Sequence, residues 1–335
     1  MTVVGPFGLS LRDDALDADV RAGMAAVEQG LLEATKSDVP FITQTARHLV
    51  EAGGKRFRPL LTLLAAQFGD PYAPGVVPAA VVVELTHLAT LYHDDVMDEA
   101  TLRRGAASAN ARWDNSVAIL TGDFLFSRAS NILADLGPEA VRIQAEAFER
   151  LVTGQILETT GPAPDNDPIA HYLDVIAGKT GSLIAVSGRF GAMMSGADER
   201  TVDILTQYGE RIGTAFQLAD DVLDIASDTS ESGKTPGTDL REGVPTLPVL
   251  YLRARGGGQD ADDVRLRELL DGDLSDDARH AEALRLLRAH PALERARRDT
   301  VRYADEAHTL LSGLPAIPAR AALEDLCTAV VHRAG

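Results

Sequence analysis

Apolar residues recur every three to four positions along most of the chain, the spacing that places them on one face of an α-helix. No convincing series of segments alternates apolar and polar residues, as half-buried β-strands do. The pattern therefore predicts an all-α protein, with shorter helices near the C-terminus and longer ones over 13–34, 39–52, 57–69, 76–99, 115–135, 138–160, 168–195 and 198–227.

The breaks between the predicted helices are rich in Gly and Pro, such as GGKR at 53–56, GPAPDNDP at 161–168 and the long loop DTSESGKTPGTDLREGVP at 228–245. None is long or polar enough to be an interdomain linker. The stretch GGGQD at 256–260 is the best candidate for a flexible surface loop. We therefore expect one helical domain over residues 1–335, with an N-terminal helical segment at 1–35.

Composition and charge narrow the range of partners. The 335 residues are 45% hydrophobic and 24% charged, which is typical of a globular protein. A net charge of −18 repels phosphate backbones, so we expect no nucleic acid partner. A diphosphate ligand would face the same repulsion and would need metal ions or a local group of arginines and lysines.

Three features favour a cytoplasmic location. The single cysteine, Cys327, fits a reducing compartment. The start of the chain has no basic segment followed by an apolar one, so it does not read as a secretory signal. The longest apolar runs, such as VVPAAVVVEL at 76–85, fall short of the roughly 20 residues of a membrane helix, so we expect no integral membrane segment.

The acidic pattern DDxxD occurs three times, and a single match in so acidic a chain is weak evidence. DDALD at 13–17 and the Asp pairs at 262–263 and 276–277 lie in polar surroundings typical of helix caps or solvated faces. DDVMD at 94–98 and DDVLD at 220–224 instead follow apolar helical turns, so we expect their carboxylates to project from buried helices.

The first and last acids of these two motifs lie one turn apart on a helix. Asp94 and Asp98 would share a face about 6 Å apart along the axis, as would Asp220 and Asp224. Buried carboxylates this close must protonate, pair with cations or bind metal. Oxygen clusters without cysteine favour Mg²⁺ or Ca²⁺ over zinc. Salt bridges to neighbouring helices remain the structural alternative.

Basic residues occur near the acidic motifs, in GGKRFRP, LRRG, IAGKTGSL and SGKTPGTDL. Each alone is typical of a surface charge, but several beside two buried acidic clusters indicate a diphosphate site. GKT at 178–180 is not a phosphate-binding P-loop, because Leu173 stands where that motif requires glycine and no strand precedes it.

Several long motifs together closely resemble those of the trans-polyprenyl diphosphate synthases, over roughly residues 40–330: GGKRFRP (53–59), THLATLYHDDVMDEATLRRG (86–105), GKT (178–180), GTAFQLADDVLD (213–224) and GKTPGTDLREGVPTLP (233–248). The resemblance implies the isoprenoid synthase fold, a helical bundle around a central apolar cavity with both acidic motifs at its mouth. It implies head-to-tail addition of isopentenyl diphosphate to an allylic diphosphate, releasing diphosphate. It also suggests a homodimer.

Carried over by position, the resemblance assigns a role to each candidate residue. It implies about three Mg²⁺ ions, with Mn²⁺ as an alternative, held by Asp94, Asp98 and Asp220 and supported by Asp95, Asp221 and Asp224. The allylic diphosphate would contact Arg103, Lys179 and Lys234, and isopentenyl diphosphate would contact Lys55, Arg58, His87 and Arg104. Thr180 and Gln217 would direct oxygen dipoles at the allylic cation.

Two positions qualify this assignment. A lone helix histidine such as His87 is otherwise most often a hydrogen-bonded core residue, and only the resemblance makes it a ligand. Val244 stands where many relatives have a lysine, so one diphosphate contact is missing and Lys234 would act alone.

Product length depends on the residues one and two turns before Asp94, because Cβ atoms point toward a helix's N-terminus. These are Ala89, Thr90, Thr86 and Val83, none of them aromatic. In relatives with short products a bulky ring near these positions blocks the cavity. The small residues therefore indicate a deeper tunnel and a product of about C30 to C50, for which a quinone side chain is one hypothetical use. A shorter geranylgeranyl product is the alternative.

Other classes of protein share some of these sequence features. A class I terpene cyclase shares the fold and one acidic motif, but GGKRFRP and DDVLD argue against it and against head-to-head synthases. A regulatory subunit of a heteromeric synthase would usually have lost aspartates or arginines, and both sets are intact here. An acidic calcium-binding or scaffold protein does not explain the basic clusters.

Overall fold

The computed structural model describes residues 11–227, 236–255 and 260–334. Helices dominate this part of the chain, and the all-α prediction is confirmed. The elements are α1 (Asp14–Ala34), α2 (Pro40–Glu51), α3 (Phe57–Ala66), α4 (Val76–Met97), β1 (Leu102–Arg103), β2 (Ala106–Ala107), α5 (Ala109–Arg112), α6 (Asn115–Leu136), α7 (Pro138–Thr160), α8 (Pro168–Ile176), the π-helix η2 (Ala177–Gly181), α9 (Ser182–Met194), α10 (Glu199–Ala226), α11 (Thr238–Arg241), α12 (Leu247–Ala254), α13 (Ala261–Leu270), α14 (Asp277–Ala289), α15 (Pro291–Leu311) and α16 (Pro318–Ala334).

The long predicted helices agree with the structure to within about three residues at each end, with one exception. The single helix expected over 168–195 is divided by η2, where the backbone widens into a π-turn around Lys179 and Thr180. Apolar periodicity continues across this point, so the sequence pattern does not reveal it. Such π-turns within helices often occur at functional sites.

The described chain forms two compact units, and each is considered by itself. The first comprises Met1–Glu149, Leu183–Gly209 and Leu310–Asp325. The second comprises Arg150–Ser182, Glu210–Thr309 and Leu326–Gly335. The prediction of one domain over the whole chain remains a prediction.

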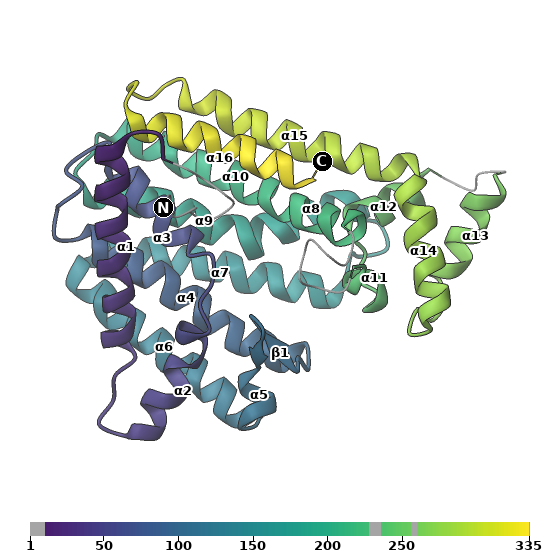
Figure 1. Cartoon of the computed structure of the whole chain (residues 1–335), viewed down its shortest axis with the longest axis horizontal. Coiled ribbons are helices and arrows are strands. Elements are labelled where there is room, and N and C mark those ends of the chain that lie inside the picture. Colours follow the sequence, from purple (N-terminus) through teal and green to yellow (C-terminus); the bar gives the residue numbers. More distant parts are fainter. Residues whose placement is uncertain (1–10, 228–235, 256–259, 335) are drawn as a thin grey trace. The chain divides into compact units, whose positions relative to one another are not determined.

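The core of the first unit is built around α4, which packs against α1, α3 and α6 (Figure 1). Its residues are apolar on nearly every side, as expected of a helix surrounded by others. At Gly122 of α6, a Cβ atom would lie 2.3 Å from Nε2 of His93 and 3.1 Å from the carbonyl oxygen of Ala89. A larger residue would therefore crowd α4 at this point.

Among the described helices, α4 alone is long and apolar enough to cross a membrane by length and composition. However, 67% of its apolar window is buried inside the protein. The core helix of a globular protein meets the same criterion, so this helix is weak evidence for a membrane span.

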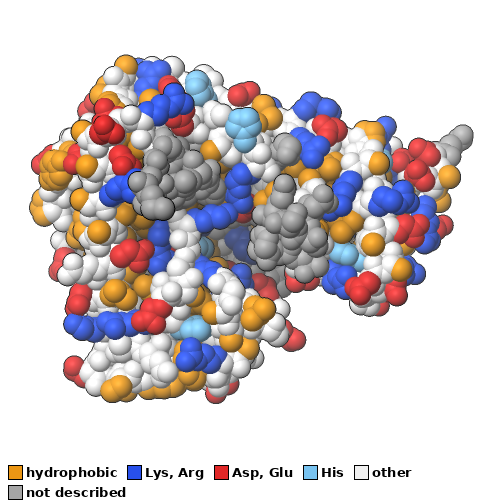
Figure 2. Space-filling view, viewed as in Figure 1, with side chains coloured by type: hydrophobic (Ala, Val, Ile, Leu, Met, Phe, Trp, Pro, Cys, Tyr) orange, Lys and Arg blue, Asp and Glu red, His pale blue; other side chains and the backbone are white. Residues whose placement is uncertain are grey.

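Two acids outside the main motifs, Asp13 and Asp276, have the capping role that the sequence suggested. Asp13 accepts a hydrogen bond from the backbone N–H of Leu16 at 2.8 Å and caps α1. Asp276 caps α14 in the same way. Charges of both signs are intermingled over α13 and α14 (Figure 2), where Arg265 pairs with Glu282 at 2.8 Å.

Candidate diphosphate and metal sites

A tight hairpin presents Arg104 to the interior of the first unit. Strands β1 and β2 are joined by Arg104 and Gly105, whose φ angles of 54° and 77° are both positive, as in a type I′ turn. The Arg104 guanidinium donates to the carbonyl of Leu49 at 3.0 Å and to that of Gly53. A Cβ at Gly54 would lie 2.7 Å from Cζ of Arg104, so the glycine at this position makes room for the arginine side chain.

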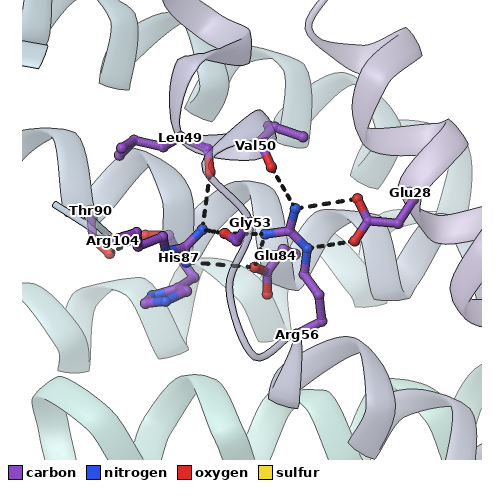
Figure 3. Close-up of polar contacts among 9 residues, drawn as sticks. All are labelled: Glu28, Leu49, Val50, Gly53, Arg56, Glu84, His87, Thr90 and Arg104. Atoms are coloured by element: carbon purple, nitrogen blue, oxygen red, sulfur yellow. Dashed lines mark hydrogen bonds and ion pairs between the residues drawn. The ribbon is translucent and has the colours of Figure 1, made fainter. Parts of the chain in front are cut away.

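Arg56 and Glu84 form a buried ion pair beside Arg104, shown in Figure 3. Arg56 also pairs with Glu28 at 2.6 Å and donates to the carbonyl of Val50 at 2.9 Å. Glu84 lies at the centre, 3.1 Å from Arg56 and 4.0 Å from Arg104. The side chain of Arg56 is only 6% exposed and has four protein partners, so it organises the loop before α3.

Arg58 and His87 complete the positive cluster, defined here as Arg56, Arg58, Arg104 and His87. The pKa of Arg58 is lowered to about 10, chiefly by burial; Glu84 opposes this shift and nearby Arg104 adds to it. Burial and the arginines hold the pKa of His87 well below its usual value, so the imidazole is neutral at pH 7. Positive charge exceeds negative charge around Glu84, and a bound anion would relieve that excess.

The structure places the predicted isopentenyl diphosphate residues in two environments. Arg58, His87 and Arg104 belong to the positive cluster. Lys55 is exposed in the loop between α2 and α3. A positive cluster that faces the protein interior, with one exposed lysine beside it, suits a ligand whose charged end loses its bound water when it binds.

In the first acidic motif, Asp95 is fully buried and Asp98 is not. Arg103 donates from Nε to Oδ1 of Asp95 at 2.5 Å, and its other end lies 3.8 Å from Asp98. The side chain of Asp98 is 57% exposed and Asp94 is partly buried. The expectation that the acids would all be buried is therefore wrong for Asp98, which lies at the C-cap of α4 where the helix reaches the surface.

The second motif repeats this arrangement in the second unit. Asp221 is buried, accepting hydrogen bonds from the hydroxyl of Tyr172 and from Nε2 of Gln217 at 3.0 Å. Asp220 is partly exposed and pairs with Arg333 at 2.7 Å. Asp224 accepts from the backbone N–H groups of Thr238 and Asp239, each at 3.2 Å, and so holds the start of α11.

In each motif the second acid is thus enclosed by protein donors, while the first acid is more accessible. Burial raises the pKa of Asp95, and the Arg103 guanidinium opposes that rise. Burial raises the pKa of Asp221 to about 7, against the effect of Tyr172 and Gln217. The enclosed acids suit supporting roles, and the first acids suit metal binding.

The residues present fit a divalent cation, although the described residues contain no group of three acids or histidines already converging on one point. Oδ2 of Asp95 is buried and accepts no hydrogen bond from the described part of the chain. Carboxylate oxygens without sulfur are ligands for Mg²⁺ or Ca²⁺. At a diphosphate site such ions take few ligands from protein and the rest from water and phosphate.

The π-turn η2 positions two more predicted residues. Lys179 pairs with Glu158 at 2.5 Å, and the hydroxyl of Thr180 donates to Oε1 of Gln217 at 3.1 Å. A Cβ at Gly154 would lie 2.6 Å from the backbone nitrogen of Lys179, so α7 approaches η2 closely there. Lys234 lies outside the described residues.

The predicted chain-length residues line the buried side of α4. Val83, Thr86 and Ala89 are 0%, 1% and 0% exposed, and Thr86 accepts a hydrogen bond from Gln144 at 3.0 Å. Thr90 is partly exposed, and its hydroxyl donates to the carbonyl of His87 at 2.8 Å. Their small size is as the sequence indicated, and their effect on product length stays a prediction. Val244 is 38% exposed beside α11.

Glu84, Glu28 and Tyr172 were missed as site residues by the sequence analysis. Glu84 had a visible signal, because a single acid inside the apolar run VVVEL must find a cation when it is buried. Glu28 and Tyr172 lie on amphipathic helices, and nothing in the neighbouring sequence distinguishes them from the other residues of these helices.

An all-helical fold with two acidic motifs and an inward cluster of arginines defines the class of isoprenoid synthases. The profile of the Polyprenyl synthetase family matches residues 39–287, so the chain belongs to the polyprenyl synthetase family. The nonaprenyl diphosphate synthase of Mycobacterium tuberculosis is 52% identical over 329 residues, covering 98% of this chain and 97% of that protein. The resemblance drawn from the motifs is thereby confirmed.

Solved structures show the same fold. A geranylgeranyl pyrophosphate synthase from Corynebacterium glutamicum, complexed with calcium and isoprenyl diphosphate, superposes with a TM-score of 0.87 and is 47% identical, covering 97% of this chain and 99% of that one. A decaprenyl diphosphate synthase from Rhodobacter capsulatus has a TM-score of 0.86 and 36% identity, covering 96% and 99%.

Proposed function

We propose that this chain adds isopentenyl diphosphate head to tail to an allylic diphosphate, giving a long-chain all-trans polyprenyl diphosphate. The observation that carries the proposal is the positive cluster around Glu84, which needs an anion in an otherwise acidic protein. Arg58 and Arg104, with Lys55 and neutral His87, bind the diphosphate of isopentenyl diphosphate.

The allylic diphosphate is bound by Arg103, Lys179 and Lys234. Asp94, Asp98 and Asp220 hold Mg²⁺, about three ions, with Mn²⁺ as an alternative. When bound, the ions stabilise the negative charge that develops on the departing diphosphate. Asp95, Asp221 and Asp224 support the ligands. The related Corynebacterium structure is complexed with calcium and isoprenyl diphosphate, which supports the use of a divalent cation.

Thr180 and Gln217 stabilise the allylic cation by presenting oxygen atoms to it. The two side chains are hydrogen-bonded to each other in the second unit, and this bond fixes the direction of their dipoles. An apolar cavity must exclude water from the cation, because water would convert it to an alcohol. The isopentenyl double bond then attacks the allylic cation, and the new cation gives a proton to the departed diphosphate, which completes the new prenyl unit.

We propose a product of about C30 to C50, because no aromatic side chain stands at Val83, Thr86, Ala89 or Thr90. The names of the nonaprenyl and decaprenyl relatives support this length. The geranylgeranyl relative favours a shorter product as the second candidate. A quinone side chain is the proposed use of the product, and the cytoplasm is the proposed location.

A homodimer is the proposed assembly. On α6, Ile119 and Leu120 are 43% and 66% exposed, which is unusual for two adjacent large apolar residues. A second copy would cover them. Light scattering after gel filtration should show a dimer. Leu120→Asp should weaken the dimer, and Val301→Asp, which changes an exposed valine of α15, should not. A monomeric wild type would contradict the proposal.

Purified protein incubated with labelled isopentenyl diphosphate, Mg²⁺ and either farnesyl or geranylgeranyl diphosphate tests the function. We expect elongation that ceases when a chelator removes the metal, with dephosphorylated products that migrate as C30 or longer. Products that stop at C20 would favour the geranylgeranyl candidate. Absence of elongation with every primer would contradict the proposed function.

A further inference from the structure

Tyr172 of α8 belongs to a hydrogen-bonded chain that ends at the proposed cation-stabilising groups. Its hydroxyl donates to Oδ2 of Asp221, whose Oδ1 accepts from Nε2 of Gln217 at 3.0 Å. Oε1 of Gln217 in turn accepts from the hydroxyl of Thr180 at 3.1 Å. Both oxygens of Asp221 are therefore used by this chain of contacts.

The order of donors and acceptors fixes which atoms remain for a substrate. Tyr172 already donates to the carboxyl group of Asp221, and Gln217 turns its NH₂ group toward Asp221 and its oxygen toward Thr180. Thr180 donates its single hydroxyl proton to Gln217, so the lone pairs of its hydroxyl oxygen remain available. The oxygen is the negative end of the hydroxyl dipole, and this end stabilises an electron-poor carbon.

The π-turn explains why α8 and η2 can make both contacts with one face of α10. Gln217 and Asp221 are four residues apart on α10, hence on one face. Tyr172 and Thr180 are eight residues apart, which in a continuous α-helix would leave their side chains about 80° apart around the axis. The wider turn at η2 reduces that rotation and brings both hydroxyls toward the same face.

We propose that Tyr172 is a positioning residue for prenyl transfer. It holds Asp221 in the orientation that aligns Gln217 and Thr180, and it has no contact of its own with the reacting carbon. The inference rests on the proposed function, since the alignment matters only if an allylic cation forms beside Thr180. Tyr172 was not among the residues that the motifs pointed to.

The test compares Tyr172→Phe with Tyr251→Phe. Tyr251 is a matched control, because it is 5% exposed, lies in the same unit and donates its hydroxyl to a carboxylate, Asp299, outside the acidic motifs. The dipoles act on the transition state, so Tyr172→Phe should lower kcat about tenfold with little change in KM for either substrate. Tyr251→Phe should retain wild-type kcat.

A double-mutant cycle with Thr180→Val distinguishes positioning from a general structural role. If Tyr172 acts through Thr180, its replacement should have little further effect once the hydroxyl of Thr180 is absent. Thermal melting of each variant shows whether it folds. If Tyr172→Phe does not fold, Asp221→Asn breaks the same chain of contacts and should show the same dependence on Thr180.

The outcomes separate this inference from the proposed function. Wild-type elongation with an unchanged kcat for Tyr172→Phe, or an equal loss with and without Thr180, overturns the positioning role alone. Absence of elongation by the wild type overturns the proposed function and this inference with it. A loss confined to kcat, specific to Tyr172 and abolished by Thr180→Val, supports it.

Discussion

Nη1 of Arg56 lies 3.1 Å from Oε1 of Glu84, and the two side chains are 6% and 2% exposed. Glu84 comes from α4, the most apolar long helix of the first unit, and Arg56 comes from the loop before α3. The pair therefore holds the loop between α2 and α3, which carries the proposed diphosphate-binding residue Lys55, against the core of the first unit. It also supplies a negative charge among the arginines of the positive cluster.

Replacing Glu84 with Gln should destabilise the ligand-free protein by about 3–5 kcal/mol, because buried guanidinium groups lose their neutralising partner. The matched control is Glu28→Gln, which removes the other carboxylate on Arg56, at a position 42% exposed, and should cost about 1 kcal/mol. Urea unfolding followed by circular dichroism measures both. Equal losses for the two variants would show that Glu84 has no special role.

The sequence predicted the helices well because their apolar periodicity is local information. It placed α4 and α10 within two residues of their ends. It could not find contacts that the fold alone creates. Arg56 and Glu84 are 28 residues apart, and Tyr172 and Asp221 are 49 apart. The I′ turn that orients Arg104 lacks the usual Asn-Gly signal, so the sequence does not reveal it.

Metal dependence should separate the functional acids from the capping acids. Asp98→Asn removes a proposed ligand, so the Mg²⁺ concentration for half-maximal elongation should rise and kcat/KM should fall about 10²-fold. Asp17→Asn alters the same position of a DDxxD pattern, but Asp17 pairs with Arg21 at 2.6 Å on the surface of α1. Its Mg²⁺ titration should match the wild type. Identical titrations for both variants would refute the assignment.

Product length should respond to bulk on the last turns of α4. Ala89→Phe should shorten the product, at a packing cost of about 1–3 kcal/mol because Ala89 is 0% exposed. Thr90→Phe, at a partly exposed position, should shorten it with less loss of stability. Chromatography of the dephosphorylated products measures the effect, with Thr90→Ser as the size-neutral control. Unchanged length in both phenylalanine variants would contradict the tunnel argument.

The stability of the metal-free protein should depend on Asp221. Its pKa is raised from 3.8 to about 7, chiefly by burial, so the folded state binds a proton more tightly than the unfolded state. The contribution is fully present below pH 3.8 and is lost as the pH rises through 7, by a few kcal/mol in total. Unfolding free energies of the wild type and Asp221→Asn, compared across this range, should therefore diverge. Parallel curves would contradict the raised pKa.

The most direct test of prenyl transfer counts two products in one reaction. Labelled isopentenyl diphosphate, an allylic primer and Mg²⁺ are incubated with the protein, and both the isopentenyl units incorporated and the diphosphate released are measured. Head-to-tail synthesis predicts one diphosphate for every unit incorporated, and neither in the presence of a chelator. Diphosphate released without incorporation would identify a cyclase or hydrolase and would contradict the account.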